Sequence, residues 1–412
     1  MYRFFILLAC GPLATILLAS ALDASAQSRS KHTVTEYVLR RAPLSAPEQL
    51  QTTAGAARNA AAVAAALGTP EPRAVVVGPH HPWKRLATLP AVAVIHDISF
   101  SSDLVGYVVA ERGLVFKTID GGYHWNTTLF SDSSDYWYGV QAASANDIVI
   151  TGFYDSYDRV KHAPIFRALA RWSHDAGATW SDSIVIRTDD WAIRGRFPDG
   201  VHGVVLGENL NGTDTPAFVT SNGGAIATDW SRVGTTNTGW FGTQFSAHAN
   251  GHVRASGTNY CESFDFGAHW SCGPQIDPVY DGETFFLDEL HGWVASGSTS
   301  PTEEGWIRKT DDGGAHWSAR TLDGPWPIRE LLFIDATTGW AVGGDAFGGI
   351  GGIYSTSDGG TSWSLDVDTG AEMSSCSKAD TMVYCAGYDR SFNGYIYALN
   401  LDQVFVDGFE TP

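Results

Sequence analysis

Arginine side chains gather in one segment of a chain that is otherwise acidic. The 412 residues hold 26 Lys and Arg against 45 Asp and Glu, a formal net charge of −19. The segment from residue 159 to residue 196 contains seven basic residues and only four acidic ones. If positions 165–172 form a strand, successive side chains point to opposite faces, so Arg167 and Arg171 should lie on the same face. This segment is a candidate binding surface, or else its arginines lie on a solvated face or between structural repeats. The candidate residues are Arg167, Arg171, Arg194 and Arg196.

Large aromatic side chains occur shortly before this segment. Tyr136, Trp137 and Tyr138 are consecutive, and residues 153–157 add one Phe and two Tyr. Adjacent aromatics could stack on sugar rings or hold a peptide, or they could cover a junction inside the fold. We therefore include these three consecutive aromatics among the candidate partner-binding residues.

No group of residues has the spacing of a metal or catalytic site. The pairs His80-His81 and His248/His252 lie in no helical pattern, and no carboxylate stands at zinc-motif spacing. The 45 acidic residues offer many carboxylate pairs, none of which is singled out. We expect no metal, no cofactor and no catalytic residue. The net charge of −19 also disfavours binding to nucleic acid.

The first 26 residues have the composition of a secretory signal. They contain Arg3, an apolar run over residues 4–22, and the small-residue sequence Ala24-Ser25-Ala26. A lipoprotein site at Cys10 is the alternative, but the apolar stretch before it has only six residues. No other run approaches the ~18 apolar residues of a membrane span. We expect export to the periplasm or the outside of a Gram-negative bacterium.

Four cysteines remain after the signal, in two close pairs. In an exported chain, the simplest of the three connectivities joins Cys261 to Cys272 and Cys376 to Cys385. A four-cysteine zinc site would have much closer pairs. We therefore predict two local disulfides.

One short motif returns along the chain at a nearly constant interval. Its five full copies are centred on Asp120, Asp175, Asp265, Asp312 and Asp358, and each ends on a tryptophan, namely Trp125, Trp180, Trp270, Trp317 and Trp363. A sixth copy, Thr220-Ser-Asn222-Gly-Gly224, lacks the tryptophan. Successive Asp or Asn positions are 55, 47, 43, 47 and 46 residues apart, a period typical of a circular or stacked repeat.

The motif suits a tight turn rather than a reaction. A carboxylate can accept hydrogen bonds from nearby backbone amides, glycine supplies positive φ, and tryptophan can cover the bend. Within one interval the sequence predicts four short strands, which is one blade of a β-propeller. Since turns spread around a ring cannot converge, we expect these aspartates to be structural.

The two ends of the repeat region should combine into one further blade. After Trp363 the sequence provides two or three strands without the motif, while residues 83–89 resemble the segment that follows each motif. A ring must close or leave sheet edges open to aggregation. We predict an all-β, seven-bladed propeller over residues 74–402, closed by an N-terminal outer strand in the last blade. Residues 27–73 should form an Ala- and Pro-rich linker or loose helix, and residues 403–412 a C-terminal tail.

The motif resembles the Asp-box, or BNR repeat, of sialidase-like propellers. Residues 83–401 look like the photosystem II stability and assembly factor family of seven-bladed propellers. This resemblance implies a non-catalytic propeller that holds a partner polypeptide with an arginine patch, although no arginine can be matched position by position. It makes an unidentified protein or peptide, or a carbohydrate, the expected partner of a monomeric protein.

A secreted sialidase-like glycoside hydrolase or a carbohydrate-binding propeller is the alternative function. Sialidases, by family resemblance, need three arginines, a Tyr–Glu pair and an Asp. The usual early Arg-Ile-Pro segment is missing here, and residues 194–198 are only a loose echo of it. The tail at residues 404–412 resembles a Phe-x-Asp-Gly-Phe-Glu ending of exported gammaproteobacterial proteins, and its role does not follow from the sequence.

Overall fold

The computed structural model describes residues 83–159, 162–209, 215–235, 244–257, 259–273, 276, 283–298 and 304–402. Contacts divide the chain after Ala74, and every described residue belongs to the second unit, Val75–Pro412. The predicted signal, linker and tail at residues 1–26, 27–73 and 403–412 lie outside the described residues. Those boundaries therefore remain predictions.

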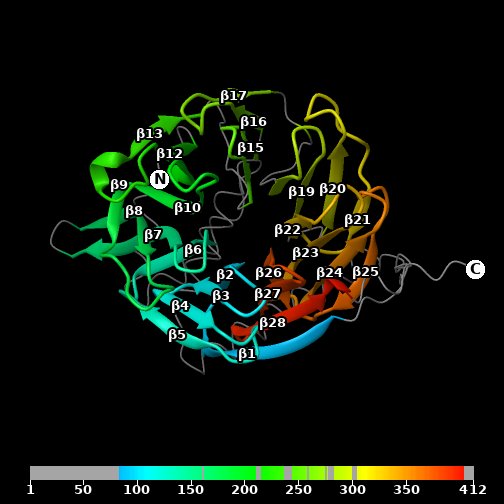
Figure 1. Ribbon diagram of the computed structural model, residues 1–412, viewed down its shortest axis with the longest axis horizontal. Coiled ribbons are helices and arrows are strands. Elements are labelled where there is room, and N and C mark those ends of the chain that lie inside the picture. The colour runs from blue at the N-terminus through cyan, green and yellow to red at the C-terminus, as the bar shows by residue number, and fades with distance from the viewer. Residues whose placement is uncertain are drawn as a thin grey trace, which may run out of the picture. The chain divides into compact units, whose positions relative to one another are not determined.

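Seven antiparallel sheets of four strands each make up the described fold, and they are arranged around a central axis (Figure 1). Blade 1 contains β2 (Ile95–Phe100), β3 (Gly106–Ala110), β4 (Leu114–Thr118) and β5 (Asn126–Phe130). Blade 2 contains β6 (Asp135–Ala142), β7 (Ile148–Asp158), β8 (Ala163–Ser173) and β9 (Ile184–Thr188). Blade 3 contains β10 (Asp190–Arg196), β11 (Gly203–Asn209), β12 (Pro216–Thr220) and β13 (Ser231–Gly234), with the short 3-10 helix η2 (Ala227–Asp229) before β13.

The remaining blades follow the same order. Blade 4 contains β14 (Ser246–Ala247), β15 (Val253–Ser256), β16 (Tyr260–Ser263) and β17 (Ser271–Cys272). Blade 5 contains β18 (Glu283–Phe286), β19 (Gly292–Ser298), β20 (Glu304–Thr310) and β21 (Leu322–Gly324). Blade 6 contains β22 (Ile328–Phe333), β23 (Gly339–Asp345), β24 (Ile350–Thr356) and β25 (Ser364–Asp368). Blade 7 contains β26 (Glu372–Lys378), β27 (Met382–Tyr388), β28 (Asn393–Asn400) and β1 (Lys84–Val92). The predicted seven-bladed propeller is confirmed.

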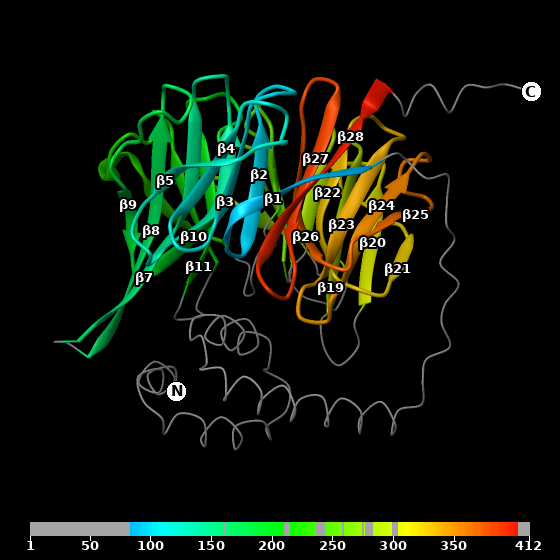
Figure 2. The ribbon, with the colours of Figure 1, turned by 90° about the horizontal axis from the view of Figure 1, so that it is seen from below.

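Strand β1 closes the ring, as the sequence predicts. It pairs antiparallel with β28, with Lys84 opposite Ala398 and Val92 opposite Asn393. Figure 2 shows β1 in blue lying along β28 in red. The indole of Trp83 donates a hydrogen bond to Asp366 of blade 6 at 3.3 Å. An N-terminal strand thus covers the open edge of blade 7, which would otherwise expose unpaired backbone groups.

The hydrophobic core lies between neighbouring sheets. One cluster joins blades 1 and 2 through Tyr107, Val109, Trp137 and Leu169. In a four-stranded antiparallel blade, the turns between strands one and two and between strands three and four share one end. The hairpin between strands two and three lies at the opposite end. We call these the box end and the hairpin end, because each repeated motif forms the turn between strands three and four.

The turn around Asp120 shows how the motif bends the chain. Thr118 donates its hydroxyl to the Asp120 carboxylate at 2.9 Å, and the His124 amide donates to the same oxygen at 2.9 Å. Gly122 has φ 85°, in the left-handed region that glycine adopts without strain. The Trp125 indole donates to the Gly122 carbonyl at 3.0 Å. The same hydroxyl-to-carboxylate bond recurs at Asp175, Asp265, Asp312 and Asp358.

The sixth copy recovers its tryptophan from later in the chain. Thr220 donates to the Asn222 side chain at 2.8 Å, as in the full copies. The Trp230 indole then donates to the Gly224 carbonyl at 3.0 Å. Tryptophan stands six residues after this glycine rather than three, and η2 occupies the intervening residues. The turn therefore keeps its tryptophan cover although the sequence spacing does not show it.

Both predicted disulfides are present, Cys261–Cys272 and Cys376–Cys385. Each joins residues that face each other on adjacent strands of one blade. Among the described residues, no helix is long and apolar enough to cross a membrane.

The turn carboxylates should make the fold sensitive to acid. The amide and then the ring of His124 lower the pKa of Asp120 to about 2, and the Thr179 hydroxyl lowers that of Asp175 to about 2. The amide of His316 does the same for Asp312, to about 2. An Asp in the unfolded chain has a pKa of about 3.9. Between about pH 4 and 2 the unfolded chain therefore binds more protons than the folded chain. We expect the contribution of these three carboxylates to the free energy of unfolding to be constant above this window and to fall as the pH drops through it.

Denaturant unfolding at pH 5, 4, 3 and 2 measures this effect. The control is the triple variant Asp120→Asn, Asp175→Asn and Asp312→Asn, whose stability should vary less over the same range. An equal pH dependence in the variant and the parent would contradict the assignment.

Candidate partner-binding site

Blade 2 carries a long hairpin at the hairpin end of the ring. Strands β7 and β8 pair from Ile148 opposite Ser173 to Asp158 opposite Ala163. This hairpin extends past the neighbouring blades at the lower left of Figure 2. Arg167 lies on β8 opposite Tyr154, with its guanidinium carbon 5.3 Å from the centre of the tyrosine ring. Arg167 is exposed, so its charge is available to a partner.

Three further exposed arginines lie at the same end of blades 1 and 2. Together with Arg167 they are Arg112, Arg159 and Arg187, and we call these four residues the arginine surface. Arg112 and Arg159 occupy the turns of the β3–β4 and β7–β8 hairpins, and Arg187 pairs opposite Ala168 on β9. Within the described ranges none of the four forms an ion pair with a carboxylate.

A backbone hydrogen bond and a strand pairing connect the blade 1 turn to this hairpin. The amide of Gly113, next to Arg112, donates to the Asp135 carbonyl at 2.8 Å, and Asp135 pairs opposite Tyr154. Acidic neighbours are present as well, since Asp158 and Asp189 lie in the same segments. The surface is therefore mixed in sign.

Arg171 does not extend the arginine surface. Its side chain is half-buried, and its Nε donates a hydrogen bond at 2.7 Å to the hydroxyl of Ser183, the residue before β9. The alternation of residues 165–172 does place it on the same strand face as Arg167, but only Arg167 is exposed.

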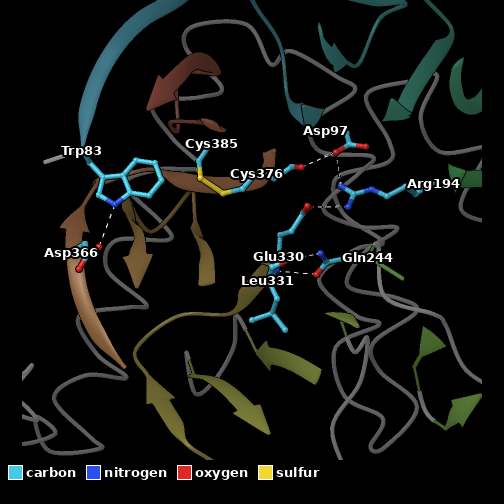
Figure 3. The surroundings of a disulfide bond; sticks show 10 residues. Trp83, Asp97, Arg194, Gln244, Glu330, Leu331, Asp366, Cys376 and Cys385 are labelled. Atoms are coloured by element: carbon cyan, nitrogen blue, oxygen red, sulfur yellow. Dashed lines mark hydrogen bonds and ion pairs between the residues drawn. A yellow bond between two sulfur atoms is a disulfide. The ribbon is translucent and has the colours of Figure 1, made fainter. Parts of the chain in front are cut away.

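Arg194 lies in the interior, at the axis of the ring. Its side chain is 1% exposed and forms two ion pairs, one to Asp97 of blade 1 at 3.1 Å and one to Glu330 of blade 6 at 2.8 Å (Figure 3). Arg196 is half-buried, 3.8 Å from Asp97, and burial lowers its pKa. The four arginines grouped by the sequence thus occupy two separate places, and Arg194 is not available at the surface.

Of the three predicted aromatics, two are part of the core. Tyr136 is 6% and Trp137 0% exposed, and the Trp137 indole donates to the Ser131 hydroxyl at 3.2 Å. Tyr138 is half-buried and stacks on His96 of blade 1, with ring centres 3.7 Å apart. These residues cover the junction between blades 1 and 2, which is the alternative that the sequence left open.

A repeated position supplies the charges at the axis. Four phenylalanines cover the glycine that opens the second strand of their blade, and the residue three places before each is charged. These charged residues are Asp97, Arg194, Glu283 and Glu330, in blades 1, 3, 5 and 6. All four are at most 4% exposed. By strand register, the equivalent residues in blades 2, 4 and 7 are Gly139, Gln244 and Ser375. We call these seven residues the axial belt.

Hydrogen bonds tie the axial belt together across the ring. Ser375 donates to Asp97 at 2.7 Å, and the amide of Val140 donates to the other Asp97 oxygen at 2.9 Å. Gln244 donates to the Leu331 carbonyl at 2.6 Å and accepts from the Leu331 amide at 2.9 Å (Figure 3). A Cβ on Gly139 would lie 3.0 Å from the Arg194 Cα, so glycine leaves room for the arginine. Burial raises the pKa of Glu330.

Sequence reasoning singled out Arg194, as a surface residue, and missed the other six residues of the axial belt. The signal was a charged residue inside an apolar strand, as in His96-Asp97-Ile98 and Arg329-Glu330-Leu331. Such a residue must be paired when it is buried, but the sequence does not name its partner. Arg194 and Glu330, for example, are 136 positions apart.

Comparisons with known proteins agree on the fold. No protein-family model and no curated protein matches the chain, so the Asp-box assignment stays a prediction. The structure "YCF48 bound to D1 peptide" matches with a TM-score of 0.58 at 15% identity, over 79% of this chain and 99% of that one. YCF48 from Cyanidioschyzon merolae matches with a TM-score of 0.54 at 18% identity, over 78% of this chain and 99% of that one. The WD40 β-propeller domain of Doa1 matches with a TM-score of 0.56 at 13% identity, over 78% of this chain and 99% of that one. These identities support a shared propeller fold and nothing finer.

Proposed function

We propose that this protein is an exported, non-catalytic propeller that binds an extended, acidic peptide segment of a partner protein at the arginine surface. One observation carries the proposal: at the hairpin end of blades 1 and 2, four exposed arginines have no carboxylate partner among the described residues, on a chain of net charge −19. Guanidinium groups bind carboxylates with two parallel hydrogen bonds, and Tyr154 adds an aromatic face beside Arg167. The YCF48 structure with a D1 peptide offers a propeller of the same fold that holds a peptide.

The axial belt supports placing the partner at the arginine surface rather than at the axis of the ring. Arg194, which could clamp a substrate carboxylate in a sialidase-like site, is already bonded to Asp97 and Glu330. This arrangement favours binding over the glycosidase alternative. The two disulfides favour an oxidising compartment, the periplasm or the outside of the cell.

Charge reversal on the arginine surface tests the proposal. Peptides selected against the wild-type protein from a phage-displayed random library should be acidic and bind more weakly as ionic strength rises. The double variant Arg167→Glu and Arg187→Glu should lose about tenfold or more in affinity, measured by fluorescence anisotropy, at an unchanged melting temperature.

The matched control is Lys378→Glu, which reverses an exposed charge at the box end of blade 7. It should leave the affinity unchanged. Selected peptides that bind the double variant as tightly as the wild type would place the binding site elsewhere.

A further inference from the structure

Exposed apolar side chains concentrate at the box end of the ring. Of the eight large apolar side chains exposed among the described residues, seven lie in turns at this end: Leu104, Ile119, Tyr123, Val201, Ile226, Phe264 and Leu290. The eighth, Phe347, lies at the hairpin end. Solvent-exposed apolar groups that cluster on a soluble protein mark an interaction surface.

Three of these side chains belong to blade 1 and form what we call the blade 1 patch. Leu104 is 58%, Ile119 68% and Tyr123 61% exposed. Leu104 lies in the β2–β3 turn, and the other two lie in the turn around Asp120. The two turns are in contact, because the amide of Gly121 donates to the Leu104 carbonyl at 2.9 Å.

The described chain ends beside this patch. The amide of Leu401 donates to the Thr381 carbonyl at 2.8 Å. Thr381 in turn donates its amide to the Asp103 carboxylate at 2.9 Å and its hydroxyl to the same group at 2.6 Å. Asp103 directly precedes Leu104. Two hydrogen-bonded steps therefore connect the end of blade 7 to the blade 1 patch.

Ten residues follow Asp402, and four of them are large and apolar: Val404, Phe405, Val406 and Phe409. At about 3.3 Å per extended residue, Phe405 reaches about 10 Å from Asp402 and Phe409 about 23 Å. We propose that the segment 404–409 docks on the blade 1 patch of its own chain. Burial of apolar groups on both sides drives the contact, and the short connection gives the segment a high effective concentration at this patch.

The exposed turn of blade 4 provides a matched control for this proposal. Phe264 holds the same position in its motif as Ile119 and is 66% exposed. Strands β16 and β17 lie across the ring from β28 in Figure 1. The proposed contact predicts that changes at Ile119 affect the segment and that the same change at Phe264 does not.

Hydrogen exchange of the full mature chain tests the proposal. Amides of residues 404–409 should exchange about tenfold more slowly than in a synthetic peptide of residues 403–412. The double variant Leu104→Ser and Ile119→Ser should restore the peptide rate, as should Phe405→Ser with Phe409→Ser, whereas Phe264→Ser should keep the slow rate. Because the changed patch residues are exposed, the melting temperature should stay constant.

A photocrosslinker at position 119 identifies the occupant. A crosslink to residues 404–409 within one chain is the expected product. Exchange at the peptide rate in the wild type would overturn the proposal. A crosslinked dimer with protection that rises with protein concentration would overturn it too, in favour of a second copy on the patch.

Discussion

Replacing Arg194 with Met should lower the free energy of unfolding by about 3–5 kcal/mol. The guanidinium is 1% exposed and is bonded to two carboxylates that are themselves at most 5% exposed. Its removal takes away the only ion-pair partner that Glu330 has among the described residues and leaves Asp97 with the more distant Arg196, at 3.8 Å. Denaturant unfolding at pH 7 measures the loss, and the exposed Arg167→Met is the matched control, with an expected change within about 0.5 kcal/mol.

The pH dependence of this variant separates lost charge pairing from lost packing. Without Arg194, burial should hold the pKa of Glu330 above its unfolded value even more strongly than in the parent. The folded state then binds the extra proton, so stability falls as the pH rises through this window. The deficit of Arg194→Met should therefore be smaller at pH 5 than at pH 7. Adding Asp97→Asn and Glu330→Gln should recover part of the loss, and no recovery would contradict the ion-pair account.

Replacing Gly343 with Ala should lower the free energy of unfolding by about 3 kcal/mol, at the upper end of typical overpacking costs. Gly343 lies on β23 opposite a bulge in the inner strand β22. A Cβ there would overlap the carbonyl oxygen of Pro327, and a backbone atom cannot move aside as a flexible side chain can. A Cβ would likewise overlap a backbone carbonyl oxygen of the inner strand at the equivalent glycines of blades 2, 3 and 7, which are Gly152, Gly207 and Gly387.

Gly273→Ala is the control for this substitution. Its Cβ would meet no atom closer than 3.8 Å, the carbonyl oxygen of Tyr260, so its stability should change little. Thermal unfolding of both variants provides the measurement. Equal melting temperatures for Gly343→Ala and the parent would show that the inner-strand bulge adapts to a side chain.

The bulges connect these two predictions. In blades 1, 2, 3, 6 and 7 the inner strand has a register shift close to its axial belt residue. A bulge inserts one residue and redirects the side chains beside it. In blades 2, 3, 6 and 7 a glycine on the second strand makes room for the bulge, whereas blade 1 has Ala110 at this position. The bulge places the belt residue near the axis. Substitutions at the axial belt residues and at these glycines should therefore destabilise the fold for related reasons.

The amino-acid sequence by itself determined the architecture. The motif around each aspartate is held by bonds within eight residues, such as Thr118 to Asp120 and Trp125 to Gly122, so the repeat can be recognised locally. Its period predicted the blades, the unpaired strands at the two ends predicted the closure by β1, and the close cysteine pairs predicted the disulfides. Short-range bonds depend on neighbours in the chain, which a sequence displays directly.

Only the tertiary structure decided which polar residues are available to a partner. Arg167 and Arg194 look alike in sequence, yet one is exposed on a projecting hairpin and the other is enclosed by carboxylates of blades 1 and 6. Trp137 likewise belongs to the core although it stands in an aromatic cluster. The axial belt takes one residue from each blade, and its bonds span as many as 278 positions, from Asp97 to Ser375. Such contacts depend on where the closed ring brings distant strands, and no local pattern records that distance.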